Sequence, residues 1–100
     1  MSIISAFPSG GALLLSATLT AAGWSATAPY TQTVAVAGVL AADNPIVDLN
    51  MSGATVDTAS ALQENWACVG RLAAGAGTLT AYCYEEKPEV DLPMTIKAVR

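Results

Sequence analysis

Charged side chains are scarce in this chain of 100 residues, which has 4 Lys and Arg residues against 8 Asp and Glu residues. The charged fraction of 12% is about half of the roughly 25% that is typical of soluble domains. A small monomer with so few charges has little to cover its surface, so we expect part of this surface to meet other subunits. The alternative is a monomer whose surface is a neutral mixture of Ser, Thr and Ala.

Positive charge is the scarcer sign: the net charge is −4, and the first 70 residues contain no Lys or Arg. So few cations cannot form the basic patch that neutralises phosphates, and we therefore expect no nucleic-acid partner. A secretory signal needs a cationic start, and the apolar run over residues 11–22 is too short to span a bilayer. We predict a protein that is made in a cytoplasm without an export signal and that has no membrane partner.

Histidine is absent, which removes the usual base of serine and cysteine nucleophiles. No glycine-rich phosphate loop is followed by a lysine, and the Gly-Ala-Gly sequence at 75–77 is typical of a hairpin turn. The carboxylates at 85–86 and 89–91 lie on a proline-bounded linker, where we expect them to be solvated rather than to bind calcium. The sequence therefore predicts no enzyme, no cofactor and no metal site.

The chain has only two cysteines, Cys68 and Cys83. A hairpin that is symmetric about residues 75–76 would place them opposite each other, on the apolar side of the ribbon that faces the core. A disulfide would close a short loop, whereas two reduced thiols would pack as small apolar groups. Because a cytoplasm is reducing, we favour the thiols. Neither cysteine has a histidine or a neighbouring cation to activate it, so neither is expected to be catalytic.

The spacing of apolar residues predicts six strands and one helix. Alternation with polar residues is typical of half-buried strands, and a spacing of three or four is typical of a helix, whose dipole Asp57 would complement. The fold class is therefore α+β, mainly β: an antiparallel sheet or a small sandwich in the order β-β-β-α-β-β-β. The strands are expected over 13–21, 31–37, 46–51, 68–73, 78–85 and 94–99, and the helix over 54–66.

A Pro-Ser-Gly hinge separates residues 1–11 from a β-rich oligomerising domain over 12–100. Ile3, Ile4 and Phe7 would form a small apolar anchor, able to add to a neighbouring sheet edge or to fill a groove. We interpret this segment as a docking peptide for a larger assembly. The alternatives are a terminal strand of the same domain and a disordered tail.

The aromatic residues predict a contact surface, because tyrosine and arginine are enriched where proteins meet. Two tyrosines of the hairpin would lie on its outer side beside an arginine, unless the helix covers that side. A tryptophan and a third tyrosine flank the corner between the first two strands, where they would join the contact or close one end of the sheet. The candidate interface residues are Val69, Arg71, Tyr82, Tyr84, Trp24 and Tyr30.

Four segments of the chain carry a resemblance to a known group of proteins. Residues 19–38 contain a strand, a Gly-Trp turn, a corner of small residues with a proline, and a second alternating strand, and the pattern continues over 67–72, 81–88 and 92–100. It resembles a C-terminal domain of structural proteins from tailed bacteriophages and prophages of Gram-positive bacteria, which are described as fibre, baseplate or head-fibre-like components. The resemblance covers most of the chain after residue 17.

This resemblance implies a structural role in a virion, and it names no ligand or active site. We expect a homo-oligomer, and a trimer in particular because phage fibre tips are commonly threefold. The N-terminal segment would join the trimer to other virion proteins of the head or tail. Two alternatives stay open, a capsid decoration protein and a tip that binds a receptor or a glycan.

Overall fold

The computed structural model describes residues 12–99 of the chain. Six strands and one helix follow one another in the predicted order β-β-β-α-β-β-β, which confirms the fold class. The predicted docking segment 1–11, with Ile3, Ile4 and Phe7, lies outside the described residues. The elements are β2 (Ala12–Leu19), β3 (Tyr30–Ala35), β4 (Ile46–Leu49), α1 (Val56–Trp66), β5 (Arg71–Gly75), β6 (Thr78–Cys83) and β7 (Leu92–Val99).

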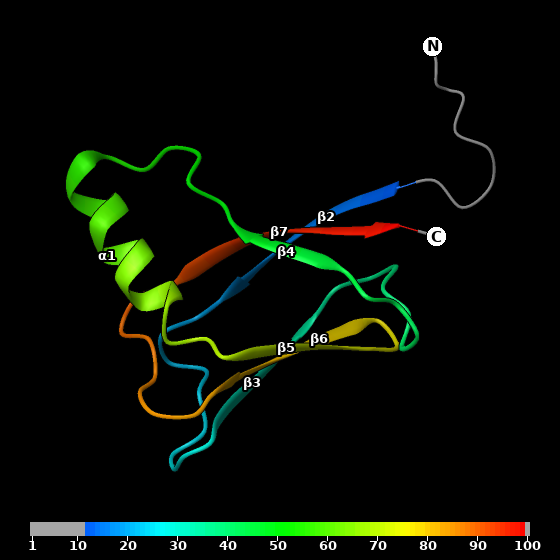
Figure 1. Ribbon diagram of the computed structural model, residues 1–100, viewed down its shortest axis with the longest axis horizontal. Helices are drawn as coiled ribbons and strands as arrows, with labels where there is room; N and C mark the ends of the chain where they lie inside the picture. The colour runs from blue at the N-terminus through cyan, green and yellow to red at the C-terminus, as the bar shows by residue number, and fades with distance from the viewer. Residues whose placement is uncertain (1–11, 100) are drawn as a thin grey trace.

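The strands form two antiparallel three-stranded sheets, with the orders β2-β7-β4 and β3-β6-β5. Figure 1 shows them as two layers, with α1 beyond one end. Of the strand pairs, only β5 with β6 joins elements that are consecutive in the chain. The first described strand pairs with the last, from Ala12 opposite Val99 to Leu19 opposite Leu92. The architecture therefore depends on contacts between distant parts of the chain.

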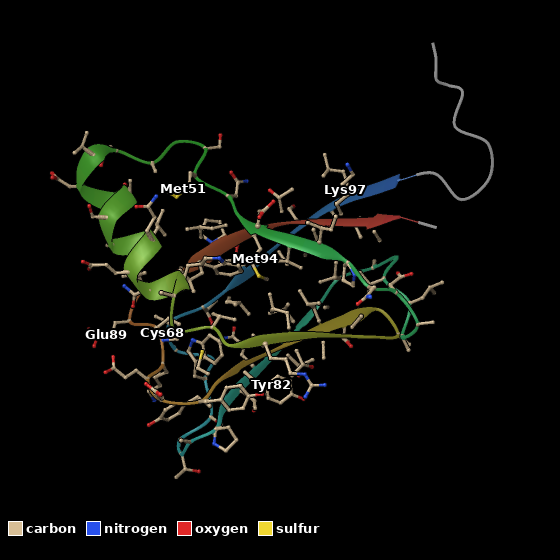
Figure 2. The ribbon with its side chains drawn as sticks, viewed as in Figure 1. Met51, Cys68, Tyr82, Glu89, Met94 and Lys97 are labelled. Carbon is tan, nitrogen blue, oxygen red and sulfur yellow. The ribbon has the colours of Figure 1, made fainter. Side chains whose placement is uncertain are left out.

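The core lies between the two middle strands, β7 and β6. Alternate residues of β7 point inward, and Leu92, Met94 and Ile96 have no exposed surface. Leu79 and Cys83 of β6 are equally buried in the other sheet. Figure 2 shows Met94 between the two layers. Because side chains of a strand alternate between its faces, each sheet buries one face and leaves the other outside.

A buried glutamine joins the two sheets at one corner. The Gln32 side chain on β3 is only 7% exposed. Its Oε1 accepts from the backbone N–H of Thr20 at 2.9 Å, and its Nε2 donates to the Thr20 carbonyl at 3.0 Å. Thr20 directly follows β2, so these bonds tie the end of one sheet to the other. A Cβ at Gly23 would lie 2.7 Å from the Gln32 Oε1, so the turn after β2 needs a glycine there.

The helix begins with a reciprocal cap. The Thr58 backbone N–H donates to the Thr55 hydroxyl at 3.2 Å, and the Thr55 N–H donates to the Thr58 hydroxyl at 2.7 Å. This pairing satisfies N–H groups that a helix start leaves without partners. Asp57 lies in the first turn, as predicted. Leu62 and Trp66 pack partly against the core, and the helix contacts β4 and β7 but no strand of the other sheet.

The predicted register of the β5–β6 hairpin is wrong by two residues. Gly75 pairs with Thr78, which leaves residues 76–77 as the turn, and Gly77 takes the positive φ of 71°. A glycine adopts this conformation at no steric cost, so the turn centres there rather than on 75–76. Cys68 consequently precedes β5 and does not lie opposite Cys83, whose partner on β3 is Tyr30.

The linker between β6 and β7 is held at three points. Its carboxylates are exposed, as predicted. However, the Glu89 backbone N–H donates to the Asn65 Oδ1 at 2.7 Å, and the Asp91 Oδ1 accepts from the Ala21 N–H at 2.8 Å. Pro88 is fully buried. The linker is therefore part of the packed domain and fixes the position of the segment that precedes β7.

We expect Gln32→Ala to lower the free energy of unfolding by about 1 to 3 kcal/mol, because the Thr20 N–H loses its acceptor and the Thr20 carbonyl keeps only the Gly23 N–H as a donor. Urea denaturation would measure the loss. Gln63→Ala is the matched control, since Gln63 is exposed on α1 and its truncation should cost less than about 0.5 kcal/mol. Equal losses in the two variants would contradict the role given to Gln32.

Candidate functional site

The outer side of the β3-β6-β5 sheet has small side chains over most of its area. We call it the aromatic face, after the two tyrosines at one end. The Thr33 and Thr80 hydroxyls lie 2.9 Å apart across neighbouring strands. Because α1 contacts only β4 and β7, the alternative that the helix covers this face is wrong. The aromatic face comprises Thr31, Thr33, Ala35, Arg71, Ala73, Thr80, Tyr82 and Tyr84.

Arginine and tyrosine side chains form a row along one end of this face. The rings of Tyr82 and Tyr84 are parallel within 9°, with centroids 6.3 Å apart. The Arg71 guanidinium carbon lies 5.0 Å from the Tyr82 ring centroid, in a cation–π arrangement. Tyr84 is 52% exposed. Val69, which was predicted to join them, packs against the core instead, since β5 begins only at Arg71.

The other two predicted aromatic residues lie apart from this row. Trp24 is buried in the core at the corner between β2 and β3. Its Nε1–H has no hydrogen-bond partner in the described part of the chain. Tyr30 is partly buried against the core, and the Lys87 ammonium lies 5.4 Å from its ring centroid. Both residues therefore close one end of the sandwich.

Both cysteines are free thiols. Burial raises the pKa of Cys83 to about 11, and the neighbouring Cys68 adds to this shift. Burial also raises the pKa of Cys68, helped by the negative charges of Glu86 and Glu89. Since the thiolate is the nucleophile and the metal ligand, two protonated thiols are weakly reactive at neutral pH. Among residues 12–99, no three His, Cys, Asp or Glu side chains group together as metal ligands.

A cleft of about 460 Å³ lies beyond the tyrosine end of the aromatic face. Its walls come from the C-terminal end of α1, from the connection between α1 and β5, and from the segment that follows β6. Sequence reasoning missed it, because its walls come from segments that are separate in the chain. The lining residues are Glu64, Ala67, Cys68, Gly70, Tyr84, Glu85 and Glu86.

A glycine positions the Tyr84 ring between the aromatic face and the cleft. A Cβ at Gly70 would lie 2.8 Å from the Tyr84 Cδ2, so the ring rests where only a glycine leaves room. The Gly70 backbone N–H donates to the Tyr82 carbonyl at 2.8 Å, which holds this approach to the sheet. Tyr84 therefore belongs both to the aromatic row and to the wall of the cleft.

Comparisons of the chain with models of protein families, with curated proteins and with solved structures gave no match. The site is consequently described by its own geometry. Within residues 12–99, no helix has the length and apolar character needed to cross a bilayer.

We expect Gly70→Ala to destabilise the protein by about 1 to 2 kcal/mol, because the new methyl group forces the Tyr84 ring to move. In a Tyr84→Ala background, the same change should cost less than about 0.5 kcal/mol, since nothing is left to displace. Urea denaturation of the four proteins in this cycle measures the coupling. Additive losses would show that Gly70 acts independently of the ring.

The contribution of Cys83 to stability should fall at alkaline pH. Its pKa rises from 9.0 to about 11 on folding, so the folded state keeps a proton that the unfolded state releases. This stabilisation is complete below the unfolded pKa and is lost as pH rises through the folded pKa. The difference in unfolding free energy between wild type and Cys83→Ala should therefore shrink across this interval. Cys68→Ala, as the control, should retain the decline, and a difference independent of pH would refute the assignment.

Proposed function

We propose that the chain is a bacteriophage virion structural protein, a self-associating module attached to the tail or head and resembling a fibre tip. The observation that carries this proposal is the aromatic face, a sheet surface on which Arg71 is the only charged side chain. A nearly uncharged sheet surface of short side chains is suited to close contact with another protein. The proposed role is structural, with no catalytic step.

The chemistry of the aromatic face favours contact between proteins. Interface centres are depleted in most charged residues and enriched in tyrosine and arginine. The Ala and Thr side chains around Thr33 and Thr80 are short, so a second copy can approach the sheet closely. Copies of one chain normally associate with closed symmetry. Trimeric symmetry rests on the resemblance to phage fibre proteins, and residues 1–11 would dock the trimer on other virion proteins.

A second candidate function is recognition of a receptor or a glycan. The half-exposed ring of Tyr84, parallel to Tyr82 and next to a cleft, favours it. Aromatic rings give a large rigid contact area, and the hydroxyl at the tip keeps a polar partner within reach. In that case the tyrosine end of the face would meet the host, whereas the threonine and alanine part would still meet other subunits.

Light scattering on a sizing column tests self-association, and wild type should elute as a trimer. Thr33→Arg places a large charge near the centre of the aromatic face and should give monomers. Ser16→Arg is the matched control, because Ser16 is exposed on β2 in the other sheet, and the variant should stay trimeric. A wild-type monomer, or dissociation in both variants, would contradict the proposed interface.

A further inference from the structure

The cleft beside Tyr84 holds negative charge that the described chain does not neutralise. Glu64, Glu85 and Glu86 line it, and none of their carboxylates has an ion-pair partner among residues 12–99. None of the described cations lines the cleft: Arg71 and Lys87 follow lining residues in the chain but are placed over tyrosine rings, and Lys97 is on the other sheet. Figure 2 shows Lys97 on the upper layer, away from Cys68.

The helix adds to this negative potential. Glu64 is in the last turn of α1 and Ala67 caps it, so the C-terminal end of the helix lies at the cleft wall. A helix C-terminus carries a partial negative charge that cations normally compensate, yet the last turn of α1 contains no basic residue. Burial is the main cause of the raised pKa of Cys68, and the negative charges of Glu86 and Glu89 raise it further.

The shape and lining of the cleft point to an organic cation. At about 460 Å³ it is far larger than a bare ion needs, and the described acidic side chains do not cluster as metal ligands. Tyr84 supplies an aromatic wall, and the close approach of its ring to Gly70 fixes the position of the ring. A guanidinium group is planar, stacks on aromatic rings and pairs with carboxylates through two parallel hydrogen bonds.

We propose that this cleft binds an arginine side chain presented by a partner protein. The guanidinium would lie against Tyr84 and donate to the carboxylates of Glu85 and Glu86, with Glu64 and the helix end adding attraction. A protein is the source because the cleft adjoins the aromatic face through Tyr84, so a molecule resting on that face reaches the cleft. This last step rests on the proposed function, whereas recognition of the arginine group does not.

The test is a titration of the uniformly ¹⁵N-labelled full chain with N-acetyl-arginine amide. The backbone amide chemical shifts are monitored by NMR at each step. Saturable shifts centred on Gly70, Tyr84 and Glu85 are expected, and added salt should weaken them because the attraction is ionic. N-acetyl-citrulline amide has nearly the same shape without the charge and should produce none. The double variant E85Q/E86Q should weaken binding at least about tenfold, since two charge-assisted hydrogen bonds are lost.

Glu89→Gln is the matched control variant. It removes one carboxylate charge near the cleft but not from its wall, so the affinity should change by less than about twofold. Unchanged urea midpoints in these exposed variants would confirm that the fold persists. The proposal would be overturned if the arginine probe caused no chemical-shift changes. It would also be overturned if the citrulline probe caused the same changes, or if they persisted in E85Q/E86Q. If the protein is a monomer and binds the arginine probe, the proposed self-association is refuted and the arginine site is supported. If it is a trimer and does not bind the probe, the arginine site is refuted and the self-association is supported.

Discussion

Burial of β7 against β6 is the contact on which the rest of the structure depends. β7 is the middle strand of one sheet and β6 of the other, and their inward residues have no exposed surface. Neither sheet could bury its apolar face without the other. β7 also pairs with β2, so the two ends of the described chain lie side by side in this sheet. Folding is therefore dominated by contacts between distant residues, a topology that is associated with slow folding.

Side-chain hydrogen bonds tie the strand ends, the helix and the linker together at one end of the sandwich. Gln32 ties the end of β2 to β3, and Asp91 binds the backbone of the same corner from the segment before β7. Asn65 joins the helix to that segment through the backbone of Glu89. The Gln32 and Asn65 bonds link segments that no sheet pairs together, whereas the Asp91 bond continues the pairing of β2 with β7 beyond the strand ends. They place α1 and the linker around one end of the sandwich, and this arrangement creates the cleft.

Small side chains give the protein its two contrasting surfaces. Ala and Thr on the aromatic face leave it flat and almost uncharged, with arginine and tyrosine only at one end. The carboxylates gather instead around the end of α1 and the linker, where Glu64, Glu85 and Glu86 surround the cleft. A neutral face and an acidic cleft that share Tyr84 suit one extended contact with a partner. The proposed assembly role and the proposed arginine site are therefore neighbouring parts of one surface.

The alternation of residues decided the element order and the inward faces, because side-chain direction in a strand follows from local geometry. Tyr82 was correctly assigned to the outer side of the hairpin. Register and strand pairing were not predictable in this way. A register shift of two residues leaves every side chain on the same face of the sheet. The alternation was therefore equally compatible with the wrong partner for Cys83. The turn at residues 76–77, with its positive φ at Gly77, fixes the actual register. The cleft arises only where α1, the hairpin and the linker meet, and those positions depend on which sheet each segment packs against.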